Sequence, residues 1–335
     1  MAPEGALTAP DDGTEPPRPG SSRRRLLAAA LPAVAPVVVL AVVAPDYAMP
    51  YYLGMLPATT AALASPRRPL VLAVLTALLC LVAPLAGSGV WTAVLLIAVT
   101  SAALGLAAAK GWTSGGAPAA TTVAILTVAP VALTDADPRT LAGSWPVALT
   151  VLAGGLWTAV LVAALTGGVR RKPHVPAARL ETAFYTAALV LLTGVGTWWA
   201  MTYYPDTHSW WLLLTFYAVL VPRTGEISSR ALARAGGTVL GGCVAAGLAL
   251  LQPPDVVVTV VVAVGAVATV VAYLAAPLWV FAALLTVTVI AVAPGGPAVA
   301  GAGERILLTL VGAGAAAGVL VLARAVRAAA VSPRG

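Results

Sequence analysis

The sequence contains few charged residues, and this scarcity excludes a water-soluble fold. Only 9% of the 335 residues are charged, whereas 60% are hydrophobic and the mean hydropathy is +0.95. A water-soluble domain carries about 25% charged residues, so this chain could not cover a globular surface with polar groups. The apolar residues form runs of roughly 14 to 22 residues, the length that a helix needs to cross a hydrocarbon core of about 30 Å. The runs lack the polar alternation of barrel strands.

Cysteine and histidine are also scarce, which excludes several kinds of site. Cys80 and Cys243 both lie within apolar runs, where a thiol behaves as a small hydrophobe. His174 and His208 are predicted on opposite sides of a membrane and have no Cys, Asp or Glu at ligand spacing. The sequence has no glycine-rich nucleotide loop and no paired acidic motif. We therefore expect no enzyme, no cofactor and no metal site.

Ionisable side chains are missing from the centres of the predicted spans. A charge at the bilayer centre costs about 2.5 to 3.5 kcal/mol on insertion scales and is a mark of function where it occurs. Every Asp and Glu lies in the amino-terminal tail or within a few residues of a predicted span boundary. The sequence therefore offers no candidate for a buried carboxylate relay that would move protons.

Twelve apolar runs are predicted to form transmembrane helices. They are residues 28–44, 50–64, 69–86, 90–109, 114–133, 145–166, 183–201, 209–222, 236–251, 256–275, 277–293 and 305–323. If all twelve cross and the amino terminus lies inside, every Lys and Arg except Arg139 and Arg305 is cytoplasmic, as the positive-inside rule requires. If the short second and eighth runs turned back instead, this bias would almost vanish.

The charge distribution also predicts the location of the protein and its partners. Cytoplasmic loops rich in Lys and Arg explain the net charge of +7 and the pI near 9.8 without a nucleic-acid partner. We expect a multi-pass protein of the cytoplasmic membrane with both termini in the cytoplasm. Its partners would be the lipid bilayer and a small solute, and self-association is left open.

The two halves of the chain resemble each other. Pro45-Asp46 recurs as Pro205-Asp206, and Gly154 recurs as Gly314, each 160 positions later. The recurrence predicts an all-α, polytopic transmembrane helical bundle of about twelve spans, built as two parallel six-helix repeats, which is a transporter arrangement. The predicted parts are a disordered cytoplasmic tail at 1–25, a first repeat at 26–168, a basic cytoplasmic connector at 169–182, a second repeat at 183–325 and a cytoplasmic tail at 326–335.

A basic segment after the eighth run is the first candidate for solute binding. It contains Arg223, Glu226, Arg230 and Arg234. A helix would place Glu226, Arg230 and Arg234 on one face, because they are four residues apart. One interpretation is a solvated loop with a surface ion pair, and the other is an electropositive vestibule that concentrates anions at the cytoplasmic mouth. The pair Arg67-Arg68 is an equally basic counterpart in the first half.

Two short runs at matching positions of the halves are the second candidate, because interrupted spans of this kind indicate a transport path. The run 50–64 is interrupted by Pro57, and the run 209–222 ends at Pro222. The polar side chains near their middle are Thr59, Thr60, Thr215 and Tyr217. The alternative is that such hydroxyls bond only to carbonyl groups of their own helix.

The stretch from Pro222 to Gly242 resembles the fusaric-acid-resistance-like family of integral membrane bound transporters. The family pattern has a Trp-rich external end, a short span, a Pro, a basic stretch, Gly-Thr and a further Gly. The matching positions are Trp210-Trp211, Pro222, Arg230, Arg234, Gly237, Thr238 and Gly241. The match continues with Arg305 before the last span and Gly312 within it. The first half departs from the pattern, since Arg67-Arg68 has no Gly-Thr after it.

The resemblance implies an exporter of aromatic carboxylates or related small amphipathic anions. Arg223, Arg230 and Arg234 would attract the solute at the inner mouth, and an ion gradient would supply the energy. Pro222, Gly237, Thr238, Gly241, Arg305 and Gly312 would be structural positions of the motif. An anion channel of similar architecture and a membrane scaffold that does not transport remain the alternatives.

Overall fold

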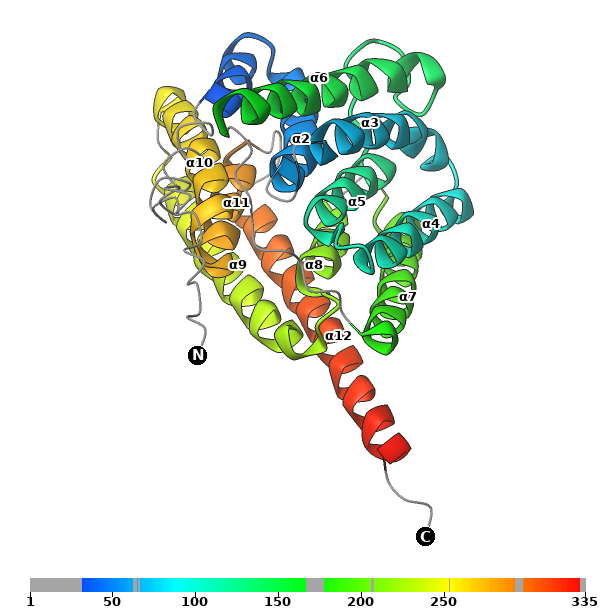
Figure 1. Cartoon of the computed structure of the whole chain (residues 1–335). Helices are drawn as coiled ribbons and strands as arrows, with labels where there is room; N and C mark the ends of the chain where they lie inside the picture. Colours follow the sequence, from blue (N-terminus) through cyan, green and yellow to red (C-terminus); the bar gives the residue numbers. More distant parts are fainter. Residues whose placement is uncertain are drawn as a thin grey trace, which may run out of the picture.

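The computed structural model describes residues 32–62, 65, 67–166, 178–205, 208–252, 254–292 and 298–331, and within these ranges it contains helices and no strand (Figure 1). In chain order the helices are Pro32–Val43, α2 (Pro45–Ala62), α3 (Arg68–Ala86), α4 (Val90–Ala108), α5 (Thr113–Val128), α6 (Leu141–Thr166), α7 (Arg179–Tyr203), α8 (Trp210–Val219), the 3-10 turn η1 (Thr224–Glu226), α9 (Ile227–Leu250), α10 (Asp255–Ala275), α11 (Leu278–Val292) and α12 (Ala298–Val331).

Each of the twelve predicted runs overlaps a helix, and the all-helical fold is confirmed. In the described part of the chain, seven helices are long and apolar enough to cross a membrane, namely α3, α4, α6, α7, α9, α10 and α12. Four apolar helices are shorter, at 10–17 residues: Pro32–Val43 and parts of α5, α8 and α11. The chain is therefore a multi-pass membrane protein, while twelve complete spans stay a prediction.

Two helices begin earlier than the sequence indicated. The predicted spans started at residues 236 and 305, because a charged residue was taken as the span boundary. The structure starts α9 at Ile227 and α12 at Ala298. The added part of α9 contains Ala, Leu and Arg, and that of α12 contains three Ala and one Glu, which are good helix formers. Arg234 and Arg305 are consequently each the eighth residue of a helix, about 10 Å along its axis at 1.5 Å per residue.

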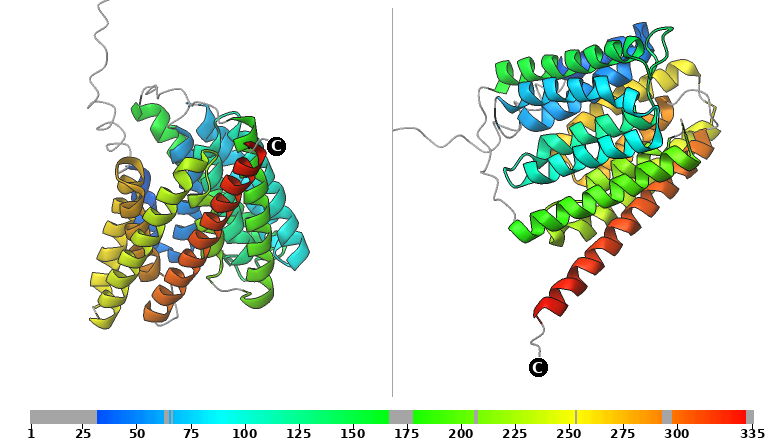
Figure 2. Two further views of the ribbon diagram at one scale, coloured as in Figure 1. Left: turned by 90° about the horizontal axis from the view of Figure 1, so that it is seen from below. Right: turned by 90° about the vertical axis from the view of Figure 1, so that its right-hand side faces the viewer.

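The ends of the chain contain further differences. Helix α12 continues to Val331, into the segment predicted as a cytoplasmic tail, and it extends beyond its neighbours (Figure 2). The predicted tail 1–25, most of the connector 169–182, and residues 332–335 lie outside the described residues.

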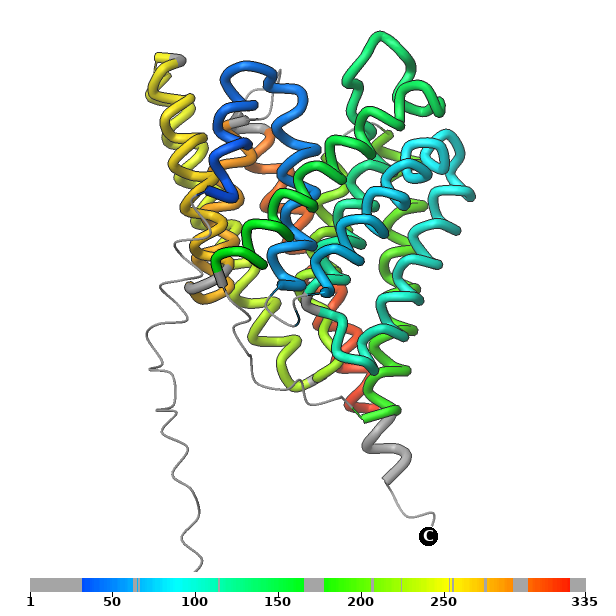
Figure 3. Tube along the Cα trace, turned by 45° about the horizontal axis from the view of Figure 1, so that its top comes forward, coloured from blue at the N-terminus to red at the C-terminus, as the bar shows by residue number. Residues whose placement is uncertain are grey.

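The helices of the two halves pack in a similar order. In the first half α6 packs against α2 and α3, and α5 packs against α3 and α4. In the second half α12 packs against α8 and α9, and α11 packs against α9 and α10. The first helix of each half lies on the other half, since α7 packs on α4, and Val34 and Val37 join a core with Val270 of α10 (Figure 3). Two repeats stay a prediction, which this order supports.

Close backbone approaches show that the repeat spacing is not constant at 160. A Cβ atom on Gly54 in α2 would collide with the backbone of Val151 in α6, and one on Gly312 in α12 would lie 2.9 Å from Thr215 in α8. These contact pairs are each 161 positions apart. Gly314, the predicted counterpart of Gly154, has no atom of another element near it, so Gly312 occupies the packing position.

Candidate functional site

The structure does not gather the four residues of the predicted vestibule at one place. Arg223 and Glu226 form an ion pair of 3.6 Å with both side chains about half exposed. The Nε atom of the half-buried Arg230 donates a hydrogen bond to the carbonyl oxygen of Ala218, at 3.2 Å. Arg234 is buried, with 1% of its surface exposed. Arg223 and Glu226 therefore belong to the turn between α8 and α9, Arg230 links the first turn of α9 to the end of α8, and Arg234 belongs to the interior.

The basic pair of the first half is split in the same way. Arg67 is exposed before the start of α3. Arg68 donates a hydrogen bond of 2.9 Å to the carbonyl oxygen of Gly111, and its guanidinium lies 4.6 Å from the ring centre of Trp112. These contacts tie the start of α3 to the turn between α4 and α5.

Three of the predicted midplane hydroxyls bond to their own helices. Thr59 donates to the carbonyl oxygen of Met55 at 2.9 Å, and Thr60 donates to those of Leu56 and Pro57. Thr215 donates to the carbonyl oxygen of Trp211 at 2.9 Å. This is the geometry of the alternative interpretation, in which the hydroxyl satisfies a helix carbonyl. A role in a transport path stays a prediction for these residues.

Tyr217 lies in a buried chain of hydroxyl groups that joins three helices. Its hydroxyl is 2.8 Å from the hydroxyl of Ser101 in α4, which is 2.8 Å from the hydroxyl of Thr193 in α7. Thr193 donates to the carbonyl oxygen of Leu189, so the direction that satisfies every donor runs from Tyr217 through Ser101 to Thr193. The partners are 116 and 92 residues apart in sequence, and no sequence signal connects them.

Replacing Tyr217 by Phe should destabilise the protein by about 1 kcal/mol, the usual net value of one buried hydrogen bond. The measurement is the thermal unfolding midpoint in detergent. Tyr203→Phe is the matched control, because Tyr203 is exposed and keeps its edge contact with Trp198 as a Phe. Equal shifts for the two variants would show that the hydroxyl chain contributes nothing to stability.

The two largest fully buried side chains of the described residues are both arginines. Arg234 of α9 is 1% exposed and Arg305 of α12 is 0% exposed. All three nitrogens of each guanidinium lack a hydrogen-bond partner. No Asp or Glu of the described residues forms an ion pair with either of them.

Arg305 has one favourable contact, with an aromatic ring. Its guanidinium carbon lies 3.4 Å from the ring centre of Trp211 in α8, and the ring centre of Trp210 lies 3.6 Å from that of Trp211. A cation over an indole face is stabilised by about 2 kcal/mol or more once desolvated. Trp211 therefore offsets part of the cost of burying Arg305, and Arg234 has no comparable contact.

The helices that carry the two arginines are antiparallel neighbours. Gly242, late in α9, lies against Ala302 and Ile306, early in α12 (Figure 1). Arg305 is adjacent to Ile306 at this contact, and Arg234 precedes Gly242 by eight residues, about two turns of α9. They therefore belong to one region of the core between α9 and α12.

Two buried threonines complete this region. Thr238 follows Arg234 by four residues in α9, and Thr309 follows Arg305 by four residues in α12. Both hydroxyls are buried and have no hydrogen-bond partner in the described structure. Residues four apart lie on the same helix face. We refer to Arg234, Thr238, Arg305 and Thr309 as the paired-arginine site.

Glycines set the position of the helices around this site. A Cβ atom on Gly237 or Gly241 would collide with the backbone of α11, at Trp279 and Ala283. Gly312 gives α12 its close approach to α8. The absence of side chains at these three positions brings α9 against α11 and α12 against α8, which is the packing role that the sequence motif implied for them.

The paired-arginine site has the physical properties of an anion-binding site. Burying a single charge without a partner costs several kcal/mol, and two such cations also repel each other. A carboxylate offers a guanidinium two parallel charge-assisted hydrogen bonds, and the threonine hydroxyls are further donors. The arrangement can therefore bind a small organic anion away from water.

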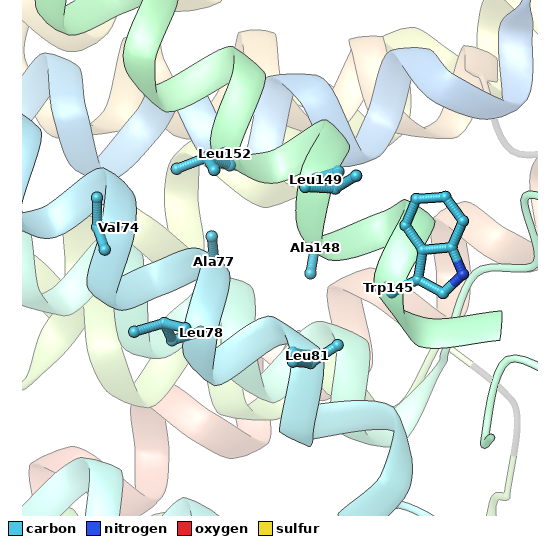
Figure 4. A pocket seen from close by; sticks show the side chains of 8 residues that line it. All are labelled: Val74, Ala77, Leu78, Leu81, Trp145, Ala148, Leu149 and Leu152. Atoms are coloured by element: carbon cyan, nitrogen blue, oxygen red, sulfur yellow. The ribbon is translucent and has the colours of Figure 1, made fainter. Parts of the chain in front are cut away.

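A second hollow lies on the other half and differs in chemistry. It has a volume of about 260 Å³ and lies between α3 and α6, where Figure 4 shows only apolar side chains around it. The lining residues are Val74, Ala77, Leu78, Leu81, Trp145, Ala148, Leu149 and Leu152. It has no group that would bind a polar solute.

Sequence reasoning assigned Arg234 to an exposed mouth and Arg305 to the outer boundary, and it did not single out Thr309. A signal was present, because an Arg followed four residues later by a Thr occurs in both α9 and α12. The burial of these residues depends on the packing of α8, α9, α11 and α12, which hydropathy alone does not reveal.

The comparison with protein families agrees with the resemblance in the second half. Residues 195–319 match the family described as fusaric acid resistance protein-like. The match contains α8 to α11 and both buried arginines, and it does not include residues 45–194, over which the sequence resemblance was weaker. No curated protein and no solved structure matched the chain. Residues 195–319 of this membrane protein are thus similar to the fusaric acid resistance protein-like family.

Proposed function

We propose that the protein is a secondary transporter that exports a small organic anion, of the aromatic carboxylate class, across the cytoplasmic membrane. The observation that supports this proposal best is the burial of Arg234 and Arg305 without an acidic partner in the described structure. Burying two cations within a membrane protein costs free energy, so such residues are expected to have a function. An anionic solute would compensate them during each transport cycle.

The route of the solute follows from the position of this site. Arg234 enters the core from the start of α9, after the basic turn that carries Arg223 and Arg230. Arg305 enters from the start of α12, at the opposite end of the antiparallel pair. With the predicted orientation, these ends are cytoplasmic and external. The solute would then pass from the basic turn to the paired-arginine site and leave it toward the external end, with an ion gradient as the source of energy.

Flux measurements with the purified protein in liposomes test this function. We expect saturable movement of radiolabelled benzoate that slows when the proton gradient is collapsed, with protein-free liposomes as the control. A voltage-driven current without saturation would instead identify an anion channel. Absence of flux for every anion tested, in liposomes that contain folded protein, would favour a scaffold and contradict the proposal.

A further inference from the structure

The number of positive charges in the paired-arginine site restricts the number of negative charges that its solute would carry. The site contributes two positive charges, and no acidic side chain of the described structure pairs with either. A solute with one carboxylate would neutralise one guanidinium and leave the other buried and uncompensated, at a cost of several kcal/mol. A solute with two negative charges would neutralise both.

The hydrogen-bond donors of the site also form two similar pairs. Arg234 and Thr238 point from one face of α9, and Arg305 and Thr309 from one face of α12, with the same four-residue spacing. Because α9 and α12 run antiparallel, the two pairs are arranged head to tail. Each pair offers a guanidinium and a hydroxyl, which is a complete set of donors for one carboxylate.

Trp211 leaves the donors of Arg305 available. The indole contacts the guanidinium carbon over its ring, and a stacked guanidinium has its N–H groups in its own plane, directed away from the ring. The contact thus fixes the orientation of the cation without using a hydrogen-bond donor. Because Trp210 lies close to the same indole, Trp211 acts as a support for Arg305 and not as a stacking surface for the solute.

The described helices α3 and α6 of the first half do not form a second copy of the site. Helix α6 contains no charged residue, and the only charged residue of α3 is Arg68, at its first position. Arg68 already donates to Gly111 and stacks on Trp112. Within the described residues, the paired-arginine site therefore has no counterpart in α3 and α6.

We propose that the paired-arginine site binds a small organic dianion, with one acidic group at Arg234–Thr238 and the other at Arg305–Thr309. This proposal rests on the proposed function, because it specifies the solute of the same site. The solute class is a compact aromatic or aliphatic molecule with two carboxylates, or with a carboxylate and a second acidic group.

Matched ligands of nearly equal size test the charge requirement. The probes are isophthalate, which has two carboxylates, and monomethyl isophthalate, which has one. The full-length protein in detergent is titrated with each, and the concentration that gives half of the maximal thermal shift is compared. We expect isophthalate to act at a concentration at least about tenfold lower, which corresponds to about 1.4 kcal/mol. The same preference should occur when the two compete with benzoate flux in liposomes.

Two variants separate a site effect from a general effect of charge. Arg234→Gln removes one cation of the site, so the preference for isophthalate should disappear. Arg324→Gln removes an exposed cation of α12, outside the proposed solute route, and should keep the preference. If Arg234→Gln does not fold, Thr238→Val and Thr309→Val replace it, because each removes one donor of the site at nearly constant volume.

The outcomes distinguish the two proposals. Equal action of isophthalate and its monoester, in a protein that transports benzoate, would overturn the dianion site and leave the proposed function in place. A preference for isophthalate in the thermal shift without any flux would support the dianion site and contradict transport. A protein that neither shifts nor transports with either compound would overturn both.

Discussion

Replacing Arg234 by Met is expected to lower solute flux at least tenfold and, in the absence of solute, to raise the stability of the protein. Arg234 is buried with all three guanidinium nitrogens unpartnered, and the neighbouring helix α12 carries a second buried cation, Arg305. Buried charged groups replaced by well-packed apolar side chains of similar volume often give a gain of about 1 to 4 kcal/mol. Met is flexible enough to fill the space of the Arg stem.

The two readouts together separate function from structure. Flux is measured in liposomes at equal protein content, and stability is measured as the thermal unfolding midpoint in detergent without solute. Arg324→Met is the control, because Arg324 lies on the exposed surface of α12 outside the proposed solute route, so this variant should keep both flux and stability. A loss of flux accompanied by a lower unfolding midpoint would instead mean that Arg234 supports the fold and does not bind solute.

Adding isophthalate should reverse the order of stability between the wild type and Arg234→Met. A ligand that binds only the folded state stabilises it more as the ligand concentration rises above Kd, so the wild type should gain stability with isophthalate and Arg234→Met should not. Functional sites commonly contain residues that bind the solute but lower the stability of the protein.

The helices were largely predictable from the sequence because their signal is local. A run of apolar residues long enough to cross a bilayer is visible in hydropathy alone, and each predicted run overlaps a helix of the structure. The helix starts were less predictable, because a charged residue was expected to mark the end of each apolar span. Arg234 and Arg305 violate that assumption, since both lie inside helices and are buried.

The composition of the site depends on contacts between distant parts of the chain. Arg305 reaches Trp211, and Ser101 reaches Tyr217, across 94 and 116 positions. Neither pair has a sequence feature that indicates its partner. The motif residues Gly237 and Gly241 were expected as structural positions, and the structure supplies the reason, which is the backbone of α11 beside them.

Replacing Gly237 by Ala is expected to destabilise the protein by roughly 1 to 3 kcal/mol, the cost of overpacking a well-packed interior. The added Cβ atom would collide with the backbone carbonyl of Trp279, and it would lie 2.8 Å from the Cβ atom of Ala282. A backbone carbonyl cannot turn away as a flexible side chain can, so α9 would have to move from α11. This movement would also displace Arg234, which lies about one turn earlier in α9, and flux should fall together with stability.

Gly236→Ala is a matched control from the neighbouring position. Gly236 has no atom near its missing Cβ and lies on the exposed face of α9, so the same substitution there meets open space. Ala favours a helix over Gly by about 1 kcal/mol, and Gly236→Ala should therefore be neutral or slightly stabilising, with normal flux. The two variants add the same methyl group to adjacent residues, so helix propensity predicts the same effect for both. Opposite signs in the unfolding midpoint would assign the difference to the α9–α11 contact, and a shared stabilisation would show that α9 does not approach α11 as closely as the structure indicates.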